Sequence, residues 1–332
     1  IFALRDEFAS QGINRFVLCG MGGSSLAPEV ITKNAKVDLV VLDSTAPDQV
    51  AAALIDLDRT AVVVSSKSGS TVETDSQKRA FETAFREAGI NPTERIVIVT
   101  DPGSPLDKAS REAGYRVFNA DPNVGGRYSA LTAFGLVPSG LAGADITALL
   151  TAAVAVSPAL GSDSVDNPAL QLGALLARSK NGAGYRDKFL IESDGLAGFG
   201  DWVEQLVAES TGKEDKGILP VVIDSQAPEI SALPEDTLLI RFGSEATGNT
   251  DAAFSGSLGE LFLLWEYATV IAGFLQGINP FDQPNVESAK VAARALLDSP
   301  ATGAEVDFVD RGVSVKSYGF DLNGGCEART NL

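Results

Sequence analysis

The sequence has 332 residues, of which 45% are hydrophobic, so the chain can bury a sizeable core. Its formal net charge of −18 argues against nucleic acid as a partner, because a phosphate backbone requires a basic surface. There is no histidine, which removes the commonest acid–base side chain and the commonest metal ligand. The two cysteines, Cys19 and Cys326, make no disulfide framework, and no uninterrupted apolar run of about 18 residues is present. We therefore expect a cytoplasmic protein without a membrane partner.

The ends of the sequence indicate a piece of a longer protein. The only methionine is Met21, and residues 1–4 are patterned like the inside of an amphipathic helix. The last residue, Leu332, follows no stop signal. We therefore expect the native protein to extend beyond these residues.

The first part of the chain alternates short apolar runs with helical patterns. We expect strands at residues 15–19, 37–42, 61–65, 96–100 and 116–119, and helices at 49–57 and 71–87. Continuous Val, Ile and Leu runs suit strands that are covered on both faces. Strands that alternate with helices imply right-handed crossovers and a parallel sheet.

The same alternation resumes after a helical stretch at about 145–179. We expect strands at 188–193, 217–222 and 237–242, and helices at 201–209, 258–276 and 286–297. The sequence thus predicts an α/β protein with two parallel-sheet domains. We place the first domain at 12–143, a helical connector at 144–183, the second domain at 184–298 and a polar tail at 299–332. One further strand is expected in the tail, at 312–318.

The run Gly-Met-Gly-Gly-Ser-Ser at 20–25 joins the first expected strand to a helix. Glycines such as Gly23 let the backbone approach a ligand, and Ser24 lies beside the unpaired N–H groups of the helix start. The spacing matches neither the dinucleotide-binding pattern nor the phosphate loop of nucleoside triphosphatases. The alternative interpretation is a tight strand-to-helix turn that binds nothing.

A second polar loop, at 65–71, follows the third expected strand. Open α/β sheets bind ligands at this carboxyl edge, and a phosphate is stabilised by a helix N-terminus. Its candidate phosphate donors are Ser66, Lys67, Ser68 and Thr71. Glu73 lies three residues after Ser70, which predicts a capping box. The alternative is a Ser/Thr-rich helix cap with a solvated Lys67.

Arg127 follows two glycines after the last strand of the first domain. A guanidinium held there could reach into a cleft and stabilise developing negative charge. The alternative is a salt bridge between the domains.

In the second domain, Gln205 and Glu209 are four residues apart and share one helix face. A glutamate at a helix C-terminus is electrostatically disfavoured, which hints at a role other than stability.

Gln283 and Lys290 lie near the end of the second expected domain. They are seven residues apart, which places them two turns apart on one side of the last expected helix. The alternative is ordinary turn chemistry together with a solvated helical lysine.

Five loops, in this order, resemble the glucose-6-phosphate isomerase family, which is built from two sugar-isomerase (SIS) domains. They are residues 20–24 (GMGGS), 66–71 (SKSGST), 124–129 (VGGRYS), 209–213 (ESTGK) and 279–283 (NPFDQ). The amino-acid sequence of segments such as 198–202 (GFGDW) is most similar to that of the actinobacterial branch. That branch includes forms fused to a transaldolase.

The resemblance implies two αβα-sandwich SIS domains with flavodoxin-like parallel sheets. It implies interconversion of glucose 6-phosphate and fructose 6-phosphate through a cis-enediol, with no metal or organic cofactor. Glu209 matches the base, Arg127 the group that stabilises the enediolate, and Lys290 a residue near the ring oxygen. Phosphate-binding positions are matched by Gly23, Ser24, Ser66, Lys67, Ser68 and Thr71, and substrate-facing positions by Gln205 and Gln283. A homodimer is the family's common state.

The sequence departs from the family pattern at two points. Relatives usually have a histidine, often donated by a neighbouring subunit, that helps to open the sugar ring, and this sequence has none. Residues 68–70 read Ser-Gly-Ser where many relatives have Thr-Phe-Thr. Transaldolase-fused relatives carry histidines in a further C-terminal segment, so we expect an incomplete piece of the enzyme. The alternatives are another phosphosugar isomerase, for example one that also accepts mannose 6-phosphate, or a SIS module that binds sugar phosphate without chemistry.

Overall fold

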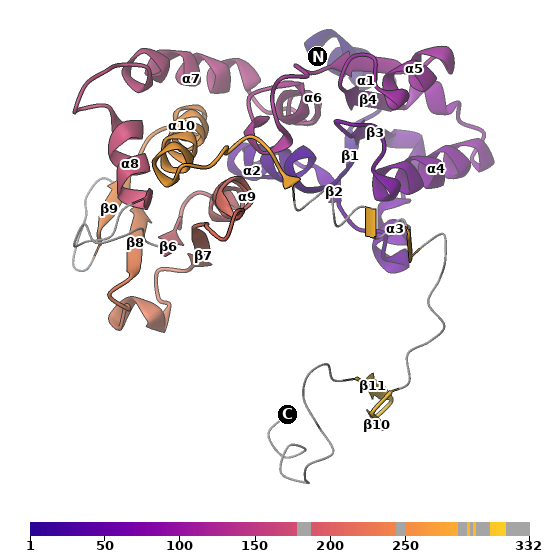
Figure 1. The fold of residues 1–332 in the computed structure, drawn as a ribbon. Helices are drawn as coiled ribbons and strands as arrows, with labels where there is room; N and C mark the ends of the chain where they lie inside the picture. Colours follow the sequence, from indigo (N-terminus) through magenta and orange to yellow (C-terminus); the bar gives the residue numbers. More distant parts are fainter. Residues whose placement is uncertain (178–186, 244–249, 285–290, 293–294, 297–305, 317–332) are drawn as a thin grey trace. The chain divides into compact units, whose positions relative to one another are not determined.

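The computed structural model describes residues 1–177, 187–243, 250–284, 291–292, 295–296 and 306–316. The chain divides into two compact units, Ile1–Asp282 and Gln283–Leu332. The larger unit holds two parallel sheets and all of the helices labelled in Figure 1.

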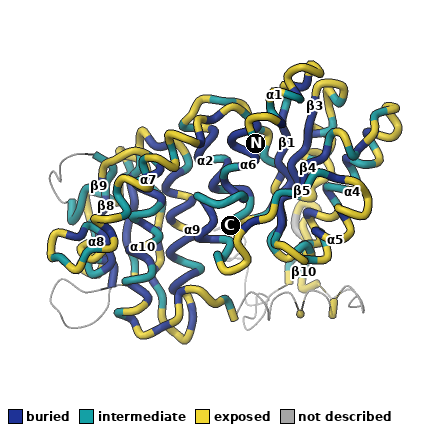
Figure 2. The backbone as a smooth tube through the Cα atoms, turned by 90° about the horizontal axis from the view of Figure 1, so that it is seen from above, coloured by how far each residue is buried: buried dark blue, intermediate teal, exposed yellow. Residues whose placement is uncertain are grey.

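The first sheet has five parallel strands in the order β2-β1-β3-β4-β5. They are β1 (Arg15–Gly20), β2 (Val40–Leu42), β3 (Thr60–Ser65), β4 (Ile96–Thr100) and β5 (Arg116–Asn119). The central strands β3 and β4 are buried along their whole length, as Figure 2 shows in dark blue. The strand expected at 37–42 is shorter than predicted and begins only at Val40.

Helices cover both faces of the first sheet. They are α1 (Phe2–Ser10), α2 (Leu26–Ala35), α3 (Pro47–Ala53), α4 (Val72–Glu87), α5 (Pro105–Glu112) and α6 (Ala133–Ala142). Neighbouring residues of β3 serve opposite faces, since Val63 packs in the core that contains Phe134 of α6 and Val62 in the core that contains Phe81 of α4. This double burial explains why the strands are continuously apolar.

The second sheet has four parallel strands in the order β7-β6-β8-β9. They are β6 (Lys188–Glu192), β7 (Leu219–Ile223), β8 (Thr237–Phe242) and β9 (Ala252–Phe254). Its helices, including those of the expected connector, are α7 (Ile146–Leu160), α8 (Pro168–Ala177), α9 (Phe199–Thr211) and α10 (Leu258–Gln276). The short β9 was not expected from the sequence. The predicted α/β class with two parallel sheets is confirmed, whereas the predicted domain boundaries stay predictions.

Helix α10 is the centre of the second half. By length and composition it could cross a membrane, with 44% of its apolar window buried. Here Trp265 of α10 is fully buried and stacks on Phe189 of β6. Helices α7 and α8 pack against it, and a Cβ at Gly259 would lie 2.0 Å from the carbonyl oxygen of Leu149 in α7. Glycine therefore allows α10 and α7 to touch through their backbones.

The smaller unit contains a short antiparallel pair, β10 (Phe308–Asp310) and β11 (Val313–Val315). Strand β11 lies within the strand expected at 312–318. Most of the helix expected at 286–297 falls outside the described residues.

Glu266 of α10 carries a buried carboxylate oxygen, Oε1, that has no hydrogen-bond partner among the described residues. Burial raises the pKa of Glu266 well above its ordinary value. The folded chain therefore holds a proton that the unfolded chain releases above about pH 4.3, so stability falls as pH rises from there toward the raised pKa. We expect Glu266→Gln to stabilise the protein more at pH 7 than at pH 4.

Urea unfolding of both forms at the two pH values measures this difference. Glu204→Gln, at an exposed position in the middle of α9, is the matched control and should change stability by less than about 0.5 kcal/mol at either pH. Equal stability of Glu266→Gln and wild type at pH 7 would contradict the assignment of a buried, proton-holding carboxyl.

Candidate functional site

Two candidate loops leave neighbouring strands of the first sheet at the same edge. Gly20 at the end of β1 pairs in register with Ser65 at the end of β3. A Cβ at Gly20 would lie 3.2 Å from the Ser24 carbonyl oxygen and 3.4 Å from that of Ser65. The loop at 20–25 therefore turns back closely over its own strand end, beside the loop at 65–71.

The loop after β3 brings several hydroxyls together in front of a helix. Ser66 is buried, and its Oγ lies 3.3 Å from Thr71 Oγ1, while Ser68 Oγ and Ser70 Oγ are 2.9 Å apart. Helix α4 begins at Val72 with Thr71 as its N-cap, and no side chain caps it. The predicted capping box of Ser70 and Glu73 is therefore wrong, because the helix begins one residue later than that pattern requires. An N-terminus without a side-chain cap leaves N–H groups for an anion.

Lys67 extends from this loop to the next strand end. Its Nζ donates to Asp101 Oδ2 at 2.6 Å and to the Pro122 carbonyl oxygen at 3.1 Å. The other oxygen of Asp101, Oδ1, is buried without a hydrogen-bond partner among the described residues. An ammonium has three donors, so one of them is left for a phosphate oxygen.

Arg127 lies in the 3₁₀ turn Gly126–Tyr128, and its side chain is only 3% exposed. Its Nε donates to Ser210 Oγ at 3.0 Å, and its Nη2 donates to the Pro280 carbonyl oxygen at 2.9 Å. Its Nη1 lies 3.8 Å from Glu209 Oε1 and has no hydrogen-bond partner in the described part of the chain. The guanidinium is thus fixed on two sides and keeps one nitrogen directed at the glutamate.

Glu209 and Gln205 lie one turn apart near the end of α9. Gln205 Nε2 donates to Glu209 Oε2 at 3.3 Å, and the Glu209 side chain is 28% exposed. A Cβ at Gly22 would lie 2.9 Å from Gln205 Nε2, so this face of α9 meets the loop after β1. Helix α9 runs from Phe199 to Thr211, which is two residues longer at each end than the helix expected at 201–209.

The structure brings the candidates at 23–24, 127, 205 and 209 together where the loop after β1 meets helix α9 and the turn at 126–128. A Cβ at Gly23 would lie 2.5 Å from the Gly126 carbonyl oxygen and 3.1 Å from the amide nitrogen of Arg127. The loop after β1 therefore packs directly against the turn that carries the guanidinium.

Three residues of this region, Tyr128, Ser210 and Lys213, were not singled out from the sequence. Tyr128 donates its hydroxyl to Ser210 Oγ at 3.1 Å, and burial raises the pKa of Tyr128 to about 12. Lys213 is buried and donates to the Asn279 carbonyl oxygen at 2.7 Å. A lysine that directly follows the end of a helix is expected to be solvent-exposed, so no local sequence pattern would have identified Lys213 as a buried residue of this region.

Two candidates are not placed in this site. Gln283 begins the smaller unit, which is described by itself. Lys290 lies outside the described residues.

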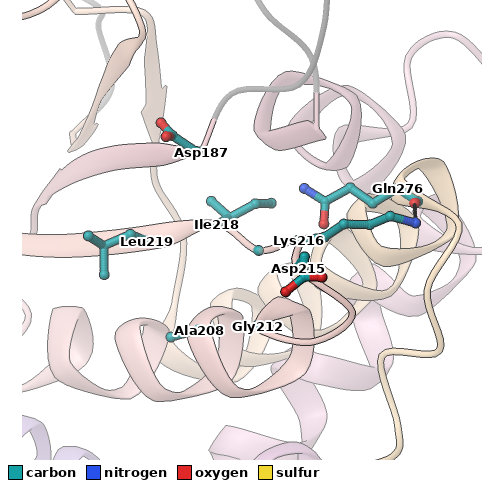
Figure 3. A pocket seen from close by; sticks show the side chains of 9 residues that line it. Asp187, Ala208, Gly212, Asp215, Lys216, Ile218, Leu219 and Gln276 are labelled. Carbon is teal, nitrogen blue, oxygen red and sulfur yellow. Dashed lines mark hydrogen bonds between the residues drawn. The ribbon is translucent and has the colours of Figure 1, made fainter.

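A cavity of about 650 Å³ lies beside the C-terminal end of α9 (Figure 3). Its walls include Asp187, Lys216 and Gln276, and none of its described lining residues is a candidate from the sequence. Over the described ranges, no group of three or more Asp, Glu, Cys or His side chains could hold a metal ion.

Known proteins share this arrangement of strands and loops. A glucose-6-phosphate isomerase of Synechococcus elongatus is 31% identical, over 84% of this chain and 65% of its own length. A protein of Haloarcula marismortui named "Probable glucose-6-phosphate isomerase" is 29% identical, over 86% of this chain and 78% of its own. The chain thus spans about two thirds of one relative and more of the other.

Two solved structures have the same fold. The crystal structure of a glucose-6-phosphate isomerase from Chlamydia trachomatis superposes with a TM-score of 0.77, at 23% identity, over 89% of this chain and 72% of that one. A hypothetical protein from Thermus thermophilus superposes with a TM-score of 0.76, at 25% identity, over 89% of this chain and 86% of that one. Residues 6–255 match the family described as phosphoglucose isomerase, which is most of the chain. This protein belongs to the phosphoglucose isomerase family.

Proposed function

We propose that the chain interconverts glucose 6-phosphate and fructose 6-phosphate through a cis-enediol, with Glu209 as the base. The observation that supports this is the pair formed by Glu209 Oε1 and Arg127 Nη1, 3.8 Å apart, with that Nη1 otherwise unpaired among the described residues. A carboxylate beside a fixed, unsatisfied donor suits a reaction that removes a proton and creates negative charge nearby. A module that only binds phosphate would need neither group.

In the direction from aldose to ketose, Glu209 takes the proton from C2 of the open-chain sugar. The electron pair of that C–H bond forms the C1–C2 double bond, and negative charge develops on O1. Arg127 stabilises this charge, because its guanidinium is fixed before the reaction begins. Glu209 then returns the proton to C1, and the O2 proton passes to O1 as the C2 carbonyl forms, so that O1 ends as a hydroxyl and no net charge remains on the sugar carbons or their oxygens.

The phosphate is proposed to bind at the edge of the first sheet. Its ligands would be the hydroxyls of the two loops, the Lys67 ammonium and the amides that open α4. They are the side chains or backbone of Gly23, Ser24, Ser66, Lys67, Ser68 and Thr71. Binding energy from this remote group would orient C1 and C2 against Glu209.

The remaining expectations belong to the same proposal. Gln205 would face the substrate from α9, Gln283 would be a further substrate-facing residue, and Lys290 would act near the ring oxygen. The parent protein would be a cytoplasmic homodimer of the actinobacterial type, fused to a transaldolase. This parent would supply the histidine that this sequence lacks.

A coupled assay tests the reaction. Fructose 6-phosphate is supplied, and glucose 6-phosphate is detected with a dehydrogenase, on this chain and on its full-length parent. We expect turnover by the parent. If the parent does not convert fructose 6-phosphate, the isomerase proposal fails, and if only this chain is inactive, residues outside it are required.

Residues 68–70 favour a second candidate function, an isomerase of wider substrate range. Their sequence, Ser-Gly-Ser, is closer to the general SIS-domain pattern than the family's Thr-Phe-Thr. The same assay with mannose 6-phosphate as substrate distinguishes an isomerase of wider range. Equal kcat/KM values for fructose 6-phosphate and mannose 6-phosphate would replace the proposal of an isomerase limited to glucose 6-phosphate and fructose 6-phosphate.

A further inference from the structure

A buried lysine connects the end of α9 to the turn after α10. Lys213 lies four residues after Glu209, and its side chain is only 2% exposed. Its Nζ donates to the Asn279 carbonyl oxygen at 2.7 Å, to the Asp282 carbonyl oxygen at 2.5 Å and to Asp282 Oδ1 at 2.6 Å. All three donors of the ammonium are used on the turn at 279–282.

The same turn holds the guanidinium. The Pro280 carbonyl oxygen accepts from Arg127 Nη2 at 2.9 Å and from the Tyr128 hydroxyl at 3.4 Å. The Asp282 carbonyl oxygen accepts from Arg127 Nη2 at 3.4 Å. Lys213 and Arg127 therefore share the Asp282 carbonyl, and a movement of this turn moves the partners of Arg127.

The backbone around Lys213 is also held in an unusual way. Lys213 and Lys216 form an isolated antiparallel bridge, and the two residues between them, Glu214 and Asp215, have φ values of 56° and 55°. Positive φ is uncommon for residues other than glycine, because the side chain then crowds the backbone. Such a turn persists when its surroundings fix it, and here the three bonds of Lys213 do so.

We propose that Lys213 is a positioning residue, which directs Arg127 Nη1 at Glu209 by holding the carbonyls of the turn at 279–282. This inference rests on the proposed isomerase function. Removal of the ammonium would leave two carbonyls and a carboxylate without their donor, and the turn would relax. The guanidinium would then lose its fixed direction, while the loops after β1 and β3 would stay in place.

The variant Lys213→Met tests this, with Lys213→Arg as the conservative form and Lys216→Met as the matched control. Lys216 belongs to the turn at 213–216 together with Lys213, but its Nζ donates to the Gln276 carbonyl oxygen at 3.0 Å (Figure 3). We expect Lys213→Met to lower kcat for fructose 6-phosphate at least tenfold with little change in KM. Lys213→Arg should recover part of the loss, and Lys216→Met should match wild type.

A double-mutant cycle separates positioning from general support of the fold. On an Arg127→Lys background, Lys213→Met should lower kcat by less than about threefold further, because residues that act through one network are not additive. Full multiplication of the two losses would overturn the proposal, and so would a kcat of Lys213→Met equal to that of wild type.

Amide hydrogen exchange supplies a readout that does not depend on turnover. We expect Lys213→Met, and not Lys216→Met, to accelerate exchange at residues 126–129 and 278–282 while the β3 amides stay protected. If the full-length parent does not turn over fructose 6-phosphate, the isomerase proposal fails and the exchange result still decides the role of Lys213. Unchanged exchange at 126–129 would overturn that role.

Discussion

Glu209→Gln is expected to lower kcat for fructose 6-phosphate by about 10²–10⁴-fold, the range that a positioned base contributes. Glutamine keeps the shape of the side chain and can still meet Gln205, but it cannot accept a proton from carbon. The phosphate loops lie on other elements, so KM should change little. The measurements are steady-state kinetics and the exchange of the C1 hydrogen of fructose 6-phosphate with deuterated solvent, both of which should be lost together.

Glu204→Gln provides the matched control, because Glu204 is an exposed residue of the same helix, α9. It should keep wild-type kcat and wild-type exchange. If Glu209→Gln retained more than about a tenth of the turnover, or still exchanged the C1 hydrogen at the wild-type rate, another residue would have to be the base.

Gly23→Ala should impair both the site and the fold. The added methyl would meet the Gly126 carbonyl oxygen at 2.5 Å and its carbon at 2.6 Å, closer than real Cβ contacts occur. Both walls are backbone, so no side chain can move aside, and the loop after β1 must separate from the turn that carries Arg127. We expect a loss of about 1–3 kcal/mol in stability from overpacking, together with a fall in kcat/KM of at least about tenfold.

Gly126→Ala is the paired control on the other side of the same contact. A Cβ at Gly126 would have nothing within 4 Å, and no positive φ requires glycine there. This variant should therefore resemble wild type in urea unfolding and in kinetics. If Gly23→Ala unfolded and turned over like Gly126→Ala, the close packing of the two loops would be disproved.

The sequence predicts the sheets well because their strands are buried on both faces. Val62 and Val63 each enter a core, so the run is apolar without alternation and is bounded by turn residues. The edge strands were harder. Strand β9, with only three residues, has too few residues for a periodic signal.

The site could be predicted only where a loop carries its own chemistry. Ser66 and Thr71 stand beside a helix start in sequence as they do in space. Arg127 and Glu209 were candidates, but their pairing joins the turn at 126–128 to helix α9, and no local pattern encodes it. Lys213 was missed for the same reason, since its burial comes from a turn far along the chain.

One hydrogen bond of the site has a consequence for how the protein becomes active. Arg127 Nη2 and the Pro280 carbonyl oxygen are 153 residues apart in sequence, and helices α6 to α10 lie between them. Contacts with such long sequence separation close late, after the local structure has formed. During synthesis the first sheet can form while the guanidinium still lacks its final partner. The hydrogen bonds of the Arg127 guanidinium are therefore complete only once the turn after α10 is in place, so the proposed catalytic geometry depends on α10 as much as on the loops after β1 and β3.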